Sequence, residues 1–144
     1  MMEGNVTVSV TTESRFGGAD DILHFSGSGR LERTDYGWHL RYHASNDADG
    51  SPVDSDVKIE TAANRAVLIN ESGESGYGLL LDPKAVTATR IEAGGSALTL
   101  NVSTKEVTAN LSGKEGTIIL EYTLLVGMQP MSALRVSIRM KKEK

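Results

Sequence analysis

Apolar and polar side chains alternate with a period of two along most of the chain. The first segment shows the pattern clearly, because Val6, Val8 and Val10 are separated by polar residues. A period of two places successive side chains on opposite faces of a strand, so the alternation predicts strands with one buried face. A sustained helical period is absent from the sequence. The chain is therefore predicted to be all-β.

The next two segments repeat this alternation on either side of a short turn at Thr34 and Asp35. Their inner faces are expected to carry Leu23, Phe25, Gly27, Gly29 and Leu31 in the first segment, and Tyr36, Trp38, Leu40, Tyr42 and Ala44 in the second. A hairpin that closes at this turn pairs Leu31 with Trp38. Each apolar side chain then has an apolar or glycine partner, as a one-sided antiparallel pair requires.

The C-terminal half gives two further signals. Gly94 and Gly95 separate Ile91 from Leu98, which predicts a tight hairpin that pairs these two apolar residues. The apolar positions then change from even to odd numbers around Lys105, which predicts a β-bulge there. Beyond the bulge, each strand is expected to pair with the next one along the chain.

The strands recur about every 8–12 residues, which is typical of a barrel or a sandwich. Pairing between neighbours favours the barrel, because Greek-key sandwiches need longer crossing connections. We expect one domain over residues 1–144: a single antiparallel meander β-barrel of about 8–10 strands. The strands should span residues 5–140, followed by a charged tail at 141–144.

Composition removes several classes of function. The 144 residues carry a formal net charge of −4 and include no cysteine, which excludes disulfides and thiolate chemistry. The sequence shows no basic stripe of the kind that nucleic-acid binding requires. It also shows no signal peptide and no apolar run approaching ~18 residues. We expect a cytoplasmic protein with neither a nucleic-acid nor a membrane partner.

The three histidines raise the question of a metal or catalytic site. His39 and His43 share a strand face but lie roughly 13 Å apart along it, too far to chelate one ion alone. In the hairpin register above, His24 becomes a diagonal neighbour of His43, and Ser26 its partner. Solvated histidines on the outer face are the preferred interpretation, so no metal and no catalytic residue is assigned.

An acidic segment at residues 45–56 invites comparison with a calcium loop. Its first ligand position holds Ser45 rather than an aspartate, Pro52 interrupts it, and Asp56 is too short for bidentate coordination. We therefore interpret the segment as an acidic hairpin loop, and no cofactor is expected.

Several amphipathic residues are expected among the aliphatic side chains of the inner face. They are Trp38, Tyr42, Tyr77, Thr87, Thr89, Thr104 and Tyr122. Apolar cavities with a few such groups bind small molecules, and barrels of about eight strands lie at the limit between filled and hollow. The leading hypothesis is a non-enzymatic barrel with a small apolar ligand inside. The alternatives are a structural or protein-interaction module with a filled core, which could form a homo-oligomer, and an enzyme of unknown reaction.

Six segments of the chain carry a resemblance to a known family. They are residues 25–29, 38–42, 57–59, 100–105, 116–122 and 134–138. In these segments the chain resembles the YwiB-like family, small bacterial proteins of unknown function with a calycin-like (lipocalin-like) β-barrel. The resemblance implies a closed meander barrel and a bacterial cytosolic protein. It transfers no catalytic residue.

Overall fold

Ten antiparallel strands form a single sheet in which neighbours along the chain pair with one another. The computed structural model describes residues 2–72, 75–93, 96–111 and 113–143. The strands are β1 (Gly4–Phe16), β2 (Ala19–Arg33), β3 (Gly37–Asn46), β4 (Pro52–Glu60), β5 (Arg65–Ser72), β6 (Ser75–Leu81), β7 (Thr87–Ala93), β8 (Ser96–Asn110), β9 (Glu115–Val126) and β10 (Gln129–Lys142). Their order in the sheet is β6-β5-β4-β3-β2-β1-β10-β9-β8-β7. The predicted all-β meander barrel is confirmed. Within the described ranges, no helix is long and apolar enough to cross a membrane.

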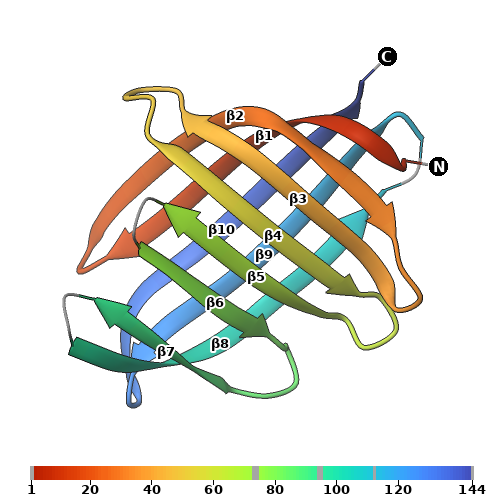
Figure 1. Ribbon diagram of the computed structural model, residues 1–144. Helices are drawn as coiled ribbons and strands as arrows, with labels where there is room; N and C mark the ends of the chain where they lie inside the picture. Colours follow the sequence, from red (N-terminus) through yellow and green to blue (C-terminus); the bar gives the residue numbers. More distant parts are fainter. Residues whose placement is uncertain (1, 73–74, 94–95, 112, 144) are drawn as a thin grey trace.

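The sheet curls until its two edge strands, β6 and β7, lie side by side (Figure 1). Among the described residues, no backbone ladder joins these two strands. Instead, the hydroxyl groups of Thr87 and Thr89 on β7 donate hydrogen bonds of 2.5 Å to the carbonyl oxygens of Leu80 and Gly78 on β6. We call this junction the seam. It gives unpaired edge carbonyls a partner, so side chains rather than a ladder close the barrel.

The faces predicted from the alternation are the faces observed, except that Tyr36 lies in the turn before β3 and is 44% exposed. The inner positions of β1, β2 and β3 form the core, with Val6, Leu31 and Leu40 all fully buried. Gly27 and Gly29 on β2 lie directly against β3, where an added Cβ atom would collide with the backbone carbonyl oxygens of the facing strand. Glycine at these two positions therefore lets β2 and β3 approach each other closely.

The predicted register of the C-terminal half is also confirmed. Ile91 on β7 lies opposite Leu98 on β8. The pairing of β8 with β9 shifts between Thr104 and Glu106, which is the bulge expected at Lys105. The turn residues 94–95 and Ser112 lie outside the described residues.

The register of the β2–β3 hairpin corrects the sequence prediction. Leu31 lies opposite Leu40 rather than Trp38. Thr34 and Gly37 close the turn through mutual backbone hydrogen bonds of 2.9 and 3.3 Å, so the loop is one residue later than predicted. The resulting shift of two residues leaves every side chain on its predicted face, and for this reason the alternation could not detect it.

The basic C-terminus belongs to the sheet. Lys141 and Lys142 pair with β1 as the last residues of β10, and the Lys142 amide also donates to the carbonyl of Lys114 at 3.0 Å. The predicted tail at 141–144 is therefore shorter than expected. Lys144 lies outside the described residues.

The two ends of the barrel differ in how they are filled. The closed end carries both chain termini and the turns at 35–36, 61–64 and 113–114 (Figure 1). Met2 is fully buried there, and its sulfur lies where a side chain on Gly116 would have to go. The open end carries the turns at 17–18, 47–51 and 127–128. The candidate functional site lies at this open end.

Candidate functional site

A cavity of about 390 Å³ occupies the barrel interior near the open end. Inner-face residues of β1, β2, β3, β4, β5, β6, β9 and β10 contribute to its wall. They include the apolar side chains Val10, Leu23, Phe25, Val53, Leu68, Leu134 and Val136. None of the described residues that line the cavity is charged. Its size and mainly apolar wall are typical of small-molecule sites, which span about 300–1,000 Å³.

Four polar side chains from four neighbouring strands cross one wall of the cavity. Tyr42, Ser55, Asn70 and Tyr77 lie directly opposite one another on β3, β4, β5 and β6. We call them the polar row. The Ser55 hydroxyl donates to Oδ1 of Asn70, and Nδ2 of Asn70 donates to Oη of Tyr77 at 2.8 Å. A further hydrogen bond joins Tyr42 to Ser55.

The proton directions along the polar row follow from the number of donors. A serine hydroxyl has a single proton, and that of Ser55 points to Asn70. At the other end, the Tyr77 oxygen accepts from Asn70, which leaves the Tyr77 proton available to a molecule in the cavity.

A third tyrosine approaches from the opposite wall. Tyr122 on β9 is only 2% exposed, and its hydroxyl makes no hydrogen bond with any described residue. Burial raises its pKa, and the neighbouring Tyr77 and Tyr42 raise it further. Burial also raises the pKa of Tyr42, although the hydrogen bond with Ser55 acts in the opposite direction. The cavity thus contains neutral phenols, and two of them, Tyr77 and Tyr122, have protons to donate.

Three of the seven residues predicted as ligand-binding come together in this cavity: Tyr42, Tyr77 and Tyr122. Trp38 does not line it. The indole is half-buried near the start of β3, and the guanidinium of Arg33 lies 5.8 Å from its ring centroid.

The three predicted threonines lie elsewhere in the barrel. Thr87 and Thr89 close the seam through their hydroxyl groups. Thr104 is buried on β8 opposite Tyr122, and its hydroxyl has no hydrogen-bond partner among the described residues. None of the three lines the cavity.

Sequence reasoning missed the middle of the polar row, namely Ser55 and Asn70. A signal for Ser55 is present in the sequence, because Ser55 has the inner-face parity of Val53 and Val57. Asn70 has no such signal, because the residues before it are apolar at both parities. A polar residue in an otherwise apolar parity indicates a polar group inside the barrel.

Exposed apolar side chains lie at the open end of the barrel, and one of them, Leu23, also lines the cavity. Four of them occupy inner-face positions at strand ends, and the fifth lies at a hairpin tip. They are Phe16 (59% exposed), Leu23 (38%), Leu98 (46%), Val126 (45%) and Met128 (85%). We call them the apolar lip. An apolar molecule that approaches this end of the barrel meets these exposed apolar side chains.

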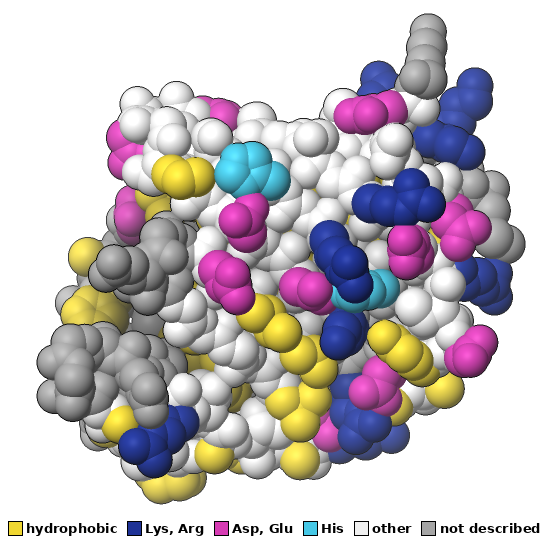
Figure 2. Space-filling view, in the orientation of Figure 1, with side chains coloured by type: hydrophobic (Ala, Val, Ile, Leu, Met, Phe, Trp, Pro, Cys, Tyr) yellow, Lys and Arg dark blue, Asp and Glu magenta, His cyan; other side chains and the backbone are white. Residues whose placement is uncertain are grey.

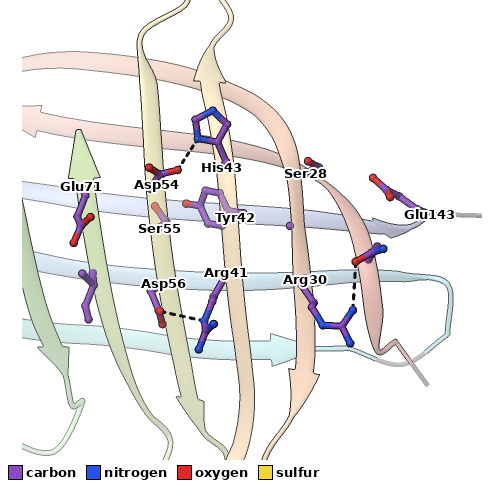
Figure 3. Close-up of a pocket in the computed structure, with 13 residues that line it drawn as sticks. Ser28, Arg30, Arg41, Tyr42, His43, Asp54, Ser55, Asp56, Glu71 and Glu143 are labelled. Atoms are coloured by element: carbon purple, nitrogen blue, oxygen red, sulfur yellow. Dashed lines mark hydrogen bonds and ion pairs between the residues drawn. The ribbon is translucent and has the colours of Figure 1, made fainter. Parts of the chain in front are cut away.

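A second hollow lies on the outer face, where charged side chains gather over β2 to β5 (Figure 2). This outer groove has a volume of about 750 Å³. Several of its polar side chains contact one another (Figure 3): Nδ1 of His43 lies 2.5 Å from Oδ1 of Asp54, and Nε of Arg41 lies 3.6 Å from Oδ2 of Asp56. The His43 and Asp54 side chains are 65% and 68% exposed. Water competes for every polar contact in such a groove, which makes it a weaker ligand site than the cavity.

The histidines do not form one site. His24 contacts the Thr11 hydroxyl at 3.2 Å, His39 lies 2.5 Å from Asp56, and His43 binds Asp54. The predicted diagonal contact between His24 and His43 is wrong, because the corrected register moves the two strands by two residues.

The same correction changes which serine lies opposite His43. Ser28, not Ser26, lies opposite His43, which in turn faces Asp54. Serine, histidine and aspartate thus follow one another across three strands. The Ser28 side chain, however, makes no hydrogen bond with any described residue. Without a serine–histidine hydrogen bond or an enclosed pocket, this row does not form a nucleophilic site.

The predicted hairpin loop in the acidic segment at 45–56 is shorter than expected: residues 47–51 form the loop, and the rest of the segment belongs to β3 and β4. Oδ1 of Asn46 accepts the amide of Ala48, and Oδ1 of Asp49 accepts the amide of Ser51, each at 2.8 Å. The hydrogen bonds from Ser51 lower the pKa of Asp49. Within the described ranges, no group of three or more His, Cys, Asp or Glu residues is arranged to hold a metal ion.

Solved structures resemble this chain to different degrees. The YwiB protein from Bacillus subtilis is similar with a TM-score of 0.78 and 20% identity, over 99% of this chain and 94% of that chain. The S-type phycobiliprotein lyase CPES from Guillardia theta gives a TM-score of 0.43 and 5% identity, over 96% of this chain and 87% of that chain. No curated protein matches the chain. A family model described as "Domain of unknown function (DUF1934)" matches residues 8–138. The resemblance to YwiB-like proteins is thereby confirmed, and the chain belongs to the DUF1934 family.

Proposed function

We propose that the barrel binds one small, largely apolar molecule in the cavity at its open end, as a binding protein rather than an enzyme. The observation that carries the proposal is the mainly apolar cavity of about 390 Å³, whose described lining residues carry no charge. An unfilled apolar space weakens a protein, because the atoms that line it lose packing contacts. A ligand that fills the space restores those contacts, and its burial from water favours binding.

The surroundings of the cavity support the same proposal. The closed end is packed with fully buried side chains such as Leu31, Ile118 and Ile138, so the hollow is confined to one end. The apolar lip gives an apolar molecule a route to the interior. Binding of this kind needs no catalytic group, and the polar row supplies the few oriented hydrogen bonds that small-molecule sites usually have.

Native mass spectrometry of the freshly purified protein and titration with an apolar fluorescent probe test the proposal. A substitution of Leu134, which is half-buried in the cavity wall, sharpens the test. Leu134→Trp fills the cavity and should weaken probe binding by about tenfold or more. Ala133→Trp, on the exposed outer face of the same strand, is the matched control and should bind as the wild type does. If neither method detects a bound molecule, the proposal fails.

The apolar lip favours a second candidate, a protein-interaction module. Met128 is 85% exposed and Phe16 is 59% exposed, and both lie at the open end. Contact of this end with a second copy would cover them. Sedimentation velocity over a range of concentrations tests this candidate: Met128→Lys should shift any association towards the monomer, and a strict monomer at high concentration contradicts it.

A further inference from the structure

The polar wall of the cavity presents protons rather than charges to a ligand. Both tyrosines with an available proton, Tyr77 and Tyr122, line the same cavity. They lie close enough for Tyr77 to raise the pKa of Tyr122. The other polar groups of the row already bond to one another, since Tyr42 bonds to Ser55, and Ser55 to Asn70. The protons of Tyr77 and Tyr122 have no acceptor among the described residues.

We propose that the ligand is a neutral molecule with a carbonyl oxygen, and that this oxygen accepts hydrogen bonds from both Tyr77 and Tyr122. This inference rests on the proposed binding function and assigns the chemical class of the ligand. A carbonyl oxygen has two lone pairs and can take one proton from each phenol. The rest of the ligand lies against the aliphatic part of the wall, which includes Val10, Leu68 and Val136.

An anionic ligand does not fit this wall. Among the described residues, no Lys, Arg or His lines the cavity, so a carboxylate would enter without a counter-charge. A buried charge without a partner is strongly disfavoured, and a carboxylic acid would bind mainly in its protonated form. The cavity therefore discriminates against fatty acids and other carboxylates near neutral pH.

A pure hydrocarbon also fits less well. It would displace water from the cavity and leave the protons of Tyr77 and Tyr122 without an acceptor. An unsatisfied buried donor lowers affinity more than a missing apolar contact does, because the donor has lost its hydrogen bond to water. The two phenols thus select for an oxygen at one position of an otherwise apolar molecule.

Three naphthalene derivatives of nearly the same shape separate these classes: methyl naphthyl ketone, isopropenylnaphthalene and naphthoate. We expect calorimetric titration near neutral pH to give about tenfold tighter binding of the ketone than of either analogue. If isopropenylnaphthalene binds as tightly as the ketone, or naphthoate binds more tightly, the inference is overturned while the binding function stands. If none of the three binds, the binding function itself fails, and the inference fails with it.

Substitution of each phenol identifies the groups responsible. Tyr77→Phe and Tyr122→Phe should each lower ketone affinity by about tenfold and leave the affinity for isopropenylnaphthalene unchanged. That second affinity shows that the cavity is intact in each variant. Tyr36→Phe removes an exposed hydroxyl outside the cavity lining and serves as the control. A ketone preference that survives both cavity substitutions contradicts the assignment.

Discussion

Two adjacent rows of inner-face residues show how differently the two ends of the barrel are built. Both rows cross β3, β4, β5 and β6, and they are separated by only two residues along each strand. The row nearer the closed end consists of Leu40, Val57, Leu68 and Leu79, all at most 1% exposed. The row nearer the open end is the polar row. A distance of two residues along each strand thus separates a tightly packed layer from a hydrogen-bonded wall.

This difference shows that register, rather than the composition of any one strand, creates the site. Each strand contributes a single residue to the polar row, and no strand is polar throughout its inner face. A shift of one strand by two residues would place an isolated Asn70 or Ser55 among leucines. Buried polar groups without partners are costly, so the hydrogen bonds of the polar row also help to fix the register.

The largest contrast between the ends is expected from truncation of a packed leucine. Leu40 is fully buried between Leu31 and Val57, so Leu40→Ala should lower the free energy of unfolding by about 2–5 kcal/mol. Leu134→Ala, at the already hollow open end, should lower it by less than about half of that amount, because Leu134 faces a cavity. Urea denaturation of both variants measures the difference. Equal losses would mean that the two ends are equally packed.

A smaller contrast is expected between two glycines of the barrel wall. A Cβ atom on Gly27 would collide with the carbonyl of His43 and lie 2.6 Å from Cα of Ala44. Gly27→Ala should therefore cost about 1–3 kcal/mol, because the backbones of β2 and β3 must separate.

The matched control for Gly27 is Gly78 at the seam. Its added Cβ would meet only Cγ1 of Ile69, at an ordinary distance of 3.6 Å. Gly78→Ala should leave the stability unchanged or raise it by about 0.4–1 kcal/mol, because alanine restricts the unfolded chain. Thermal unfolding of the two variants checks the contrast, and a loss of equal size at Gly78 would contradict the open packing at the seam.

The sequence predicts much of this fold because alternation determines the buried face independently of register. Hairpin signals then set the register where the turn chemistry is strong, as between Ile91 and Leu98. The bulge near Lys105 could be predicted because a change of parity within one strand requires one extra residue, which a β-bulge supplies. These predictions depend only on residues close together in the chain.

The candidate site was harder to predict because it depends on several registers at once. The pairing of β2 with β3 across the turn at 34–37 differs by two residues from the predicted pairing. The alternation cannot detect a shift of two residues, because it leaves every side chain on the same face. Val67, Leu68 and Ile69 are apolar on both faces, so the register of β5 was uncertain and the place of Asn70 could not be assigned. Thr87 and Thr89 share the inner-face pattern, but the sequence does not show that their strand lies at an edge of the sheet.

The smallest expected effect on stability near neutral pH comes from the buried phenol of Tyr122. This effect is also the most specific to the open end. Burial and the neighbouring tyrosines raise its pKa in the folded protein above the ordinary 10.0. The folded state thus keeps this proton when the unfolded state has lost it. The free energy of unfolding keeps the full contribution of this phenol below pH 10.0. Above pH 10.0 it falls by about 1.4 kcal/mol per pH unit for one such group.

Tyr122→Phe should remove that part of the alkaline loss and change the stability little near neutral pH, since the hydroxyl has no partner among the described residues. Urea denaturation as a function of alkaline pH measures both quantities. If Tyr122→Phe loses stability with pH as steeply as the wild type does, the Tyr122 hydroxyl is in contact with bulk water. Tyr122 would then not be a phenol shielded from water to which a ligand in the cavity could bind.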